Sequence, residues 1–402
     1  MSKGLITRSS AWRLPGWIGI PLLSAMCGVS AGYLLALGIL RGSLQGTWSD
    51  IDELTSRRAV KAPHERIVLV SIDAATIRSA GGLKPVPRAV IGEIIRRIST
   101  GHPRAIVLYL GMGAESRRGS SDDRLLGEAI KDAGCVVMAV EHVPPRDGRP
   151  ESVIAPLPRF AASSRGVGLA MLWTSDGVVR TAPMARTIDG RKWHSLPEVV
   201  ASVTIPPRGD RSVEPVPSSS DTSVIINFLG PPGSFPRVSA LALLRGEVEP
   251  SVLSGAIVLI GLSGTSSGDM HKVSGGLRRL RHQGGGPRGW LFMDGIEIEA
   301  NLIHTVLTGS AIRYAPSVAI ILRDAGVSML IAVTFVFLRG VAGYLPALLV
   351  VLVLPVLSKL GSWVAFSAWN LVFVDAVGMW GYLFTIVFAS LFQVSRNNQD
   401  AT

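Results

Sequence analysis

The clearest catalytic pattern in the chain is the segment GTSSG at residues 264–268. It fits G-x-S-x-G, in which a serine on a sharp strand-to-helix turn is the nucleophile, and Ser266 would be that serine. The segment follows an apolar run, as such a turn should, but Asp269, Met270 and the glycines that come next do not favour a helix. We therefore interpret it as a turn of small residues and keep a hydrolase that uses Ser266 as a third hypothesis.

The histidines give no metal site by their spacing. They are His64, His102, His142, His194, His271, His282 and His304, and none stands three or four residues from another, as helical metal ligands do. No glycine-rich phosphate loop follows an apolar run either. The sequence therefore predicts no metal, no cofactor and no enzymatic activity.

Three charges interrupt long apolar stretches near the C-terminus: Arg323, Asp324 and Asp375. Charges inside a membrane are rare and usually paired. Arg323 stands five residues from the outer end of its stretch and Asp375 four residues from the outer end of its own. The two side chains should lie at similar depth, so we predict an Arg323–Asp375 pair. Asp324 is the competing partner, and the alternative is that both side chains reach out to the membrane surface.

A run of five cations without an acid lies between residues 272 and 288. It contains Lys272, Arg278, Arg279, Arg281 and Arg288. A solvated loop is our preferred interpretation. The sharper one is contact with anionic lipid headgroups or an acidic partner, worth about 1 kcal/mol per cation near such a surface.

Four apolar stretches are long enough to cross a hydrocarbon core of about 30 Å. They lie at residues 16–40, 317–338, 341–357 and 371–392. The first follows a basic start, as a signal peptide would, but its apolar run is longer than usual and no A-x-A site follows it. We predict four transmembrane helices, one N-terminal and three C-terminal.

Basic residues near these stretches predict their orientation, because cytoplasmic loops carry more of them. The three before the first stretch place the tail 1–15 inside, and Arg339 and Arg396 also fall inside after further crossings. The tail 393–402 is then cytoplasmic, and residues 41–316 are extracytoplasmic.

The 402-residue chain has a net charge of +11 and a mean hydropathy of +0.38. The hydropathy excludes a disordered chain, whereas the charge alone would be compatible with a nucleic-acid partner. Residues 42–316 hold 32 basic and 26 acidic residues, so the net charge of this extracytoplasmic part is +6. Because nearly half of the charge lies at the membrane segments and tails, we predict no nucleic-acid binding.

The extracytoplasmic part alternates apolar runs with amphipathic segments. Runs at 66–72, 104–110 and 135–140 predict buried strands, and helices are expected from Pro87 and from Asp122, the latter capped by Ser121. Strands at 224–228 and 256–262 and helices at 238–244 and 295–308 continue the pattern. A turn at 175–177 is expected to join 169–173 to 178–181 as a hairpin. The fold class is α/β, with a mixed or mainly parallel sheet and helices on both faces.

Several segments together resemble the type-two CHASE domain, a bacterial extracytoplasmic sensory module. They are IVLVSID (67–73), PRAVIGEIIRRI (87–98), DDRLLGEAI (122–130), SDGVVRTAPM (175–184), the long stretch 226–269 and DGIEIEANLIHTVLTGSAIR (294–313). The resemblance covers about 63–313, and three spans after the domain are usual for the family. Two departures are Tyr109, where the family often has Asp, and the cationic stretch 272–288.

The resemblance implies a sensor or ligand-binding module, and its matched motifs give the candidate ligand residues Asp73, Arg88, Arg180, Asn227 and Asp269. Asp73 and Asp269 follow strands, where open parallel sheets bind ligands. Asp73 and Arg180 could equally form a buried structural pair. Asp176 is best explained by turn chemistry.

We therefore predict a bacterial inner-membrane receptor that binds a small ligand or partner outside. About ten residues follow the last span, so we expect no output domain and a signal that passes to a separate protein. Membrane lipids are expected partners, and a homo-oligomer is compatible with the sequence. The alternative is a non-sensing assembly or scaffold subunit. A closed pocket at the strand ends would favour sensing, and a large exposed apolar patch would favour docking.

Overall fold

The computed structural model describes residues 19, 21–28, 30, 51–52, 54–55, 61–63, 66–82, 85–174, 176–205, 223–264, 268–273, 291–342, 344–373 and 375–400. Its contacts divide the chain into two units, residues 55–312 and residues 1–54 with 313–402.

The first unit is built around a seven-stranded sheet with the order β11-β1-β12-β2-β3-β4, in which β5 also pairs with β3. Its strands are β1 (Ile67–Ile72), β2 (Ala105–Tyr109), β3 (Val136–Val143), β4 (Ser152–Ile154), β5 (Gly166–Ala170), β11 (Arg237–Ser239) and β12 (Ile257–Leu262). All pairs are parallel except β3–β4. The apolar runs of β1, β12 and β2 are buried on both faces, as central parallel strands should be.

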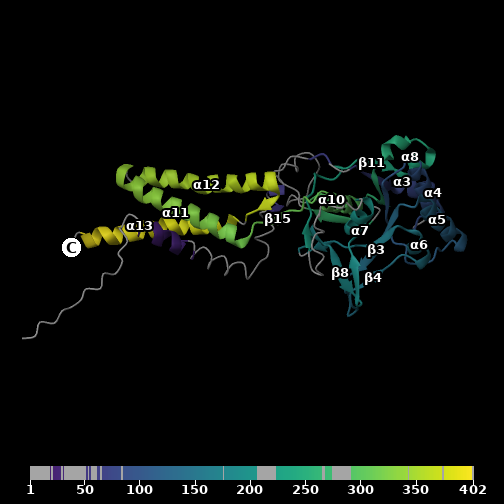
Figure 1. Cartoon of the computed structure of the whole chain (residues 1–402), viewed down its shortest axis with the longest axis horizontal. Coiled ribbons are helices and arrows are strands. Elements are labelled where there is room, and N and C mark those ends of the chain that lie inside the picture. Colours follow the sequence, from purple (N-terminus) through teal and green to yellow (C-terminus); the bar gives the residue numbers. More distant parts are fainter. Residues whose placement is uncertain are drawn as a thin grey trace, which may run out of the picture. The chain divides into compact units, whose positions relative to one another are not determined.

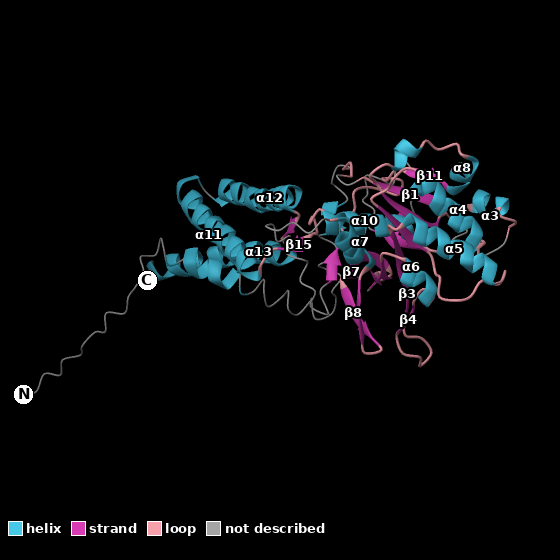
Figure 2. Ribbon diagram, turned by 45° about the vertical axis from the view of Figure 1, so that its right-hand side comes forward, coloured by secondary structure: helices cyan, strands magenta, loops and turns pink. Residues whose placement is uncertain are grey.

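Helices cover both faces of this sheet, which confirms the predicted α/β class (Figures 1 and 2). One face packs against α3 (Ala74–Ser79), α4 (Arg88–Ser99), α5 (Ser120–Ala133), α6 (Pro158–Ser163) and α8 (Ala240–Arg245). The other packs against α7 (Leu196–Thr204) and α10 (Gly295–Leu307). Helix α4 buries an apolar stripe against the sheet, formed by Ile91, Ile94, Ile95 and Ile98.

Two local expectations are wrong. Helix α5 starts at Ser120, one residue before its expected cap Ser121, and its N-cap is Gly119. Leu169, expected in a hairpin with 178–181, lies in β5 of the main sheet instead. The hairpin itself forms at the expected turn, between β6 (Trp173–Thr174) and β7 (Val178–Pro183).

A second sheet, which the sequence did not predict, has the order β10-β7-β13-β14, with β6 on β7. Its further strands are β10 (Ser223–Ile225), β13 (Met270–Val273) and β14 (Leu291–Asp294), and β8 (Ala185–Ile188) and β9 (Arg191–His194) form a separate hairpin. One side of α10 contacts the main sheet through Ile296 and Ile303, and another contacts the second sheet through Ile298 and Leu302. Helix α10 is therefore buried between two sheets.

The second unit contains α11 (Ser317–Ala342), α12 (Tyr344–Trp369) and α13 (Asp375–Asp400). Each has 26 residues, about 39 Å of helix. Buried residues of α11 and α13 form a core, against which Leu354 of α12 packs; they are Ile331, Phe335, Tyr382, Ile386 and Ala389. The short strands β15 (Arg313–Tyr314) and β16 (Leu371–Val372) pair with each other.

Two of these helices, rather than the four predicted, are long and apolar enough to cross a membrane within the described residues: Ser317–Leu338 and Leu352–Trp369. The expected span 341–357 and the break after it are wrong, because α12 continues through Pro355 to Trp369. In α13 the apolar stretch within the described side chains is Gly381–Phe392, and polar residues follow it at the end of the helix. Most of the expected span 16–40 lies outside the described residues.

Candidate functional site

A cleft of about 610 Å³ opens at the carboxyl ends of β1, β12 and β2. Its lining includes the last residue of β1, Ile72, the last residue of β12, Leu262, and Leu110 just after β2. The segment before α4 and the loop that joins β2 to α5 complete it. Parallel sheets commonly bind ligands at this edge, and the volume is in the range of small-molecule sites.

Asp122, on α5, holds the N-terminus of α4 against this cleft. Its carboxylate accepts hydrogen bonds from the backbone N–H groups of Arg88, at 3.0 Å, and Ala89, at 2.8 Å. The hydroxyl of Ser116 donates a third, at 2.6 Å. Burial alone would raise the pKa of Asp122, but these hydrogen bonds lower it below its usual value. Asp122 therefore stays ionised and replaces the side-chain cap that Pro87 cannot provide.

Arg88 lines the cleft, but its guanidinium is already engaged. It forms an ion pair with the buried Asp123 and donates to the carbonyl of Ala114. Its Cζ lies 5.1 Å from the centroid of the Phe160 ring, over the ring face. Arg88 thus fastens the β2–α5 loop to α4, which makes it a positioning residue for the cleft.

Arg117 and Arg118 lie on the same loop, line the cleft and are exposed. Within the part of the chain that the structure describes, neither guanidinium forms an ion pair within 4 Å. Sequence analysis did not select them, although a pair of cations in the loop that follows a buried strand is a signal that could have done so.

The family comparison bears on this domain. The model of the CHASE2 domain matches residues 29–341, more than three quarters of the chain. The chain belongs to the CHASE2 domain family. No curated protein and no solved structure gives a match. The predicted resemblance to a type-two CHASE sensory domain is confirmed.

Asp73 of the CHASE2 domain serves as the N-cap of α3. It accepts hydrogen bonds from the backbone N–H and the hydroxyl of Thr76, both at 2.8 Å. Burial alone would raise the pKa of Asp73, but these bonds lower it. The residue begins a helix beside the cleft without lining it.

Arg180 and Asn227 lie away from the cleft, in structural roles. Arg180 is buried on β7 and donates to both carboxylate oxygens of Asp176, at 2.8 and 3.0 Å. Asp176 also accepts from the N–H of Val178, which is the expected turn chemistry. The pair that Arg180 forms is therefore with Asp176 rather than Asp73. The amide of Asn227 donates to the carbonyl of Ser310, which follows α10.

Asp269 belongs to a separate group of acids at the start of α10. Its carboxylate lies so close to Gly295 that a Cβ there would clash with it, and His271 contacts it at 2.8 Å. Glu299, one turn further along α10, is fully buried. Neither of its carboxylate oxygens has a hydrogen-bond partner in the described chain.

Burial, and then the charge of Asp269, raise the pKa of Glu299 to about 8. Burial, Asp269, Glu299 and Glu141 raise the pKa of Tyr109 well above its ordinary value. The family often has Asp at the position of Tyr109. In this chain the tyrosine at that position lies in an acidic environment. An acid inside the apolar stretch of α10 was the signal that sequence analysis overlooked.

Ser266 and four of the five cations of the acid-free run lie outside the described residues; the four are Arg278, Arg279, Arg281 and Arg288. The fifth, Lys272, is exposed on β13. A strand, β13, follows GTSSG where a nucleophile elbow requires a helix.

In the helical unit, Arg323 forms an ion pair with Asp324 at 2.8 Å and donates to the hydroxyl of Ser362 at 3.0 Å. The hydroxyl of Tyr382 donates to the same carboxylate at 3.1 Å. The competing partner named from the sequence is therefore the one observed. The side chain of Asp375 lies outside the described side chains, so the Arg323–Asp375 pair stays a prediction.

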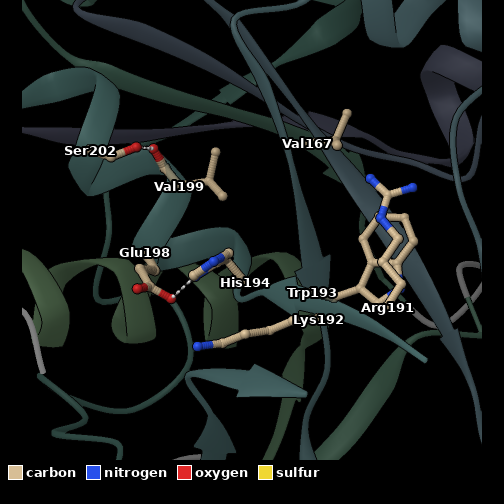
Figure 3. Close-up of a pocket in the computed structure, with 8 residues that line it drawn as sticks. All are labelled: Val167, Arg191, Lys192, Trp193, His194, Glu198, Val199 and Ser202. Atoms are coloured by element: carbon tan, nitrogen blue, oxygen red, sulfur yellow. Dashed lines mark hydrogen bonds and ion pairs between the residues drawn. The ribbon is translucent and has the colours of Figure 1, made fainter. Parts of the chain in front are cut away.

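A second hollow, of about 370 Å³, lies between the strand β9 and helix α7 (Figure 3). Arg191 stacks on the ring of Trp193, 3.9 Å from its centroid, and His194 contacts Glu198 at 3.0 Å. This groove is more open to solvent, and these polar groups are partnered within it. We therefore regard the cleft at the strand ends as the candidate site of the CHASE2 domain.

Proposed function

We propose that the protein is a bacterial inner-membrane receptor. Its CHASE2 domain, outside the cytoplasm, binds a small ligand in the cleft at the ends of β1, β12 and β2. Its C-terminal helices pass the signal to a separate protein, and both termini are cytoplasmic. The family supplies the sensory role, and the observation that carries the ligand site is the position of the cleft.

The position of the cleft also favours sensing over assembly. The cleft lies at the strand ends, where a closed pocket would favour sensing, and it has a mostly apolar lining with a few convergent polar groups. Arg88, Asp122 and Asp123, which hold its walls, are buried and engaged with one another or with the backbone, which is typical of a preformed site.

The surface of the helical unit supports a membrane location. Large apolar side chains are exposed along α11 and α12, including Leu322 at 67%, Leu345 at 68% and Val356 at 66%. Soluble proteins rarely expose apolar surface of this extent, whereas lipid-facing helices require it. Arg323 forms an ion pair with Asp324 and donates to Ser362. Such polar contacts are expected for charges inside a membrane.

Ligand binding is tested by a thermal-shift screen of small molecules on the full chain in detergent. Ala114 is exposed on the cleft wall, so Ala114→Trp should fill the cleft. Ser254, exposed before the amino end of β12, provides the control Ser254→Trp. We expect compounds that stabilise the wild type and Ser254→Trp to lose their effect on Ala114→Trp. Compounds that stabilise all three proteins equally would contradict the cleft as the site.

Orientation is tested with a membrane-impermeant maleimide on spheroplasts. A cysteine is placed at Ser254 or at Asn398 in a chain whose two native cysteines, Cys27 and Cys135, are replaced by alanine. We expect Ser254→Cys to be labelled in intact spheroplasts and Asn398→Cys only after lysis. The reverse labelling pattern would contradict the proposed topology.

A further inference from the structure

The acids that line the cleft are already engaged by partners within the protein. Asp122 accepts two backbone N–H groups and the Ser116 hydroxyl. Glu115 forms an ion pair with Arg159 at 2.6 Å. No carboxylate of the described lining is therefore left over to attract a cation.

The cations that line the cleft are not all paired with an acid of the described chain. Arg88 is committed to Asp123 and to a backbone carbonyl. Arg117 and Arg118 are exposed, and within the described chain neither forms an ion pair. Of the two, Arg118 acts on Asp122 only through its charge. The entrance of the cleft thus carries two guanidinium groups, which are suited to bidentate contact with a carboxylate or a phosphate.

The inner surface of the cleft is apolar. It is formed by Ile72, Val86, Ile91, Met112 and Leu262, of which the first four are buried. An apolar group placed there would be removed from water, which favours binding by about 25 cal/mol per Å². A fully hydrated ion such as inorganic phosphate would gain nothing from this surface.

We propose that the cleft binds an organic anion, whose apolar body lies against this inner surface and whose carboxylate or phosphate is held by Arg117 and Arg118. This inference rests on the proposed function and specifies its ligand class. The anion can be a free metabolite or the headgroup end of a lipid, because both present the same chemistry to the cleft.

The test compares matched probes on the full chain in lipid nanodiscs by calorimetry. The probes are 4-phenylbutyrate, its neutral amide 4-phenylbutanamide and inorganic phosphate. The variants are Arg117→Gln/Arg118→Gln and, as a matched pair of exposed loop arginines outside the cleft, Arg146→Gln/Arg149→Gln. Nanodiscs with and without anionic lipid distinguish the sources, because a lipid ligand would compete with the added anion only in the former.

We expect 4-phenylbutyrate to bind more tightly than its amide, and phosphate not to bind. The cleft variant should weaken 4-phenylbutyrate by about tenfold or more, because it removes the charge-assisted hydrogen bonds to the carboxylate. The control pair should leave its affinity unchanged.

Equal binding of the amide and the acid, with both lost in Ala114→Trp, would overturn the ligand class and leave the cleft as a site. Binding of the acid that Arg117→Gln/Arg118→Gln does not weaken would likewise overturn it. Failure of both compounds to bind, or binding that Ala114→Trp does not affect, would also remove the cleft as the basis of the proposed function.

Discussion

The buried carboxyl of Glu299 predicts a specific pH dependence of stability. Because it is fully buried and has no hydrogen-bond partner among the described residues, it holds a proton in the folded domain until the pH approaches its raised pKa of about 8. In the unfolded chain the same group loses its proton near its ordinary value of 4.5. Between these two values the folded state binds one more proton than the unfolded state, so stability must fall as the pH rises.

The size of this effect follows from the shift. A rise from 4.5 to about 8 is about 3.5 units, and at 1.36 kcal/mol per unit this is on the order of 5 kcal/mol. The contribution is fully present below about pH 4.5, is lost progressively up to about pH 8 and is constant above. For a domain of this size, 5 kcal/mol corresponds to roughly 10 °C in melting temperature.

The variant Glu299→Gln removes the titration but keeps the shape of the neutral acid. We expect its melting temperature to match the wild type near pH 5 and to exceed it by roughly 10 °C near pH 9. The assay is differential scanning fluorimetry of the full chain in detergent, in steps of half a pH unit. Glu128→Gln, on the surface of α5 beside Arg124, is the control and should follow the wild type. Equal pH profiles for Glu299→Gln and the wild type would refute the reasoning.

Three further predictions concern packing and charge. Arg88→Ala removes one of the two ion pairs of the buried Asp123 carboxylate, which keeps Arg159 at 3.0 Å, and should cost about 1–3 kcal/mol, seen as a lower melting temperature; an unchanged value would show that the contact is not formed. Gly168→Ala places a Cβ 2.5 Å from the Cα of Leu196, so it should destabilise by about 1–3 kcal/mol in the same assay. For the helical unit, Arg323→Gln and Asp324→Asn should show a coupling energy of about 1 kcal/mol in a double-mutant cycle; strict additivity would argue against the pair.

The sequence by itself determined the local elements of the domain and its family. Strands β1, β2 and β12 and helices α4, α8 and α10 lie within a residue or two of their expected positions, because their apolar periodicity is carried by adjacent residues. The turn at Asp176 was also predicted, since an aspartate side chain bonds to its own neighbouring backbone.

Only the tertiary structure decided which of these elements meet. The insertion of β12 between β1 and β2 joins residues about 150 to 190 positions apart, and no local pattern specifies such a pairing. The cleft, the engagement of Arg88 by Asp123 and the burial of the Glu299 carboxyl follow from that arrangement. Type and spacing predict what a side chain can do, whereas burial and neighbours, which come from distant parts of the chain, decide whether it binds a ligand, caps a helix or holds a proton.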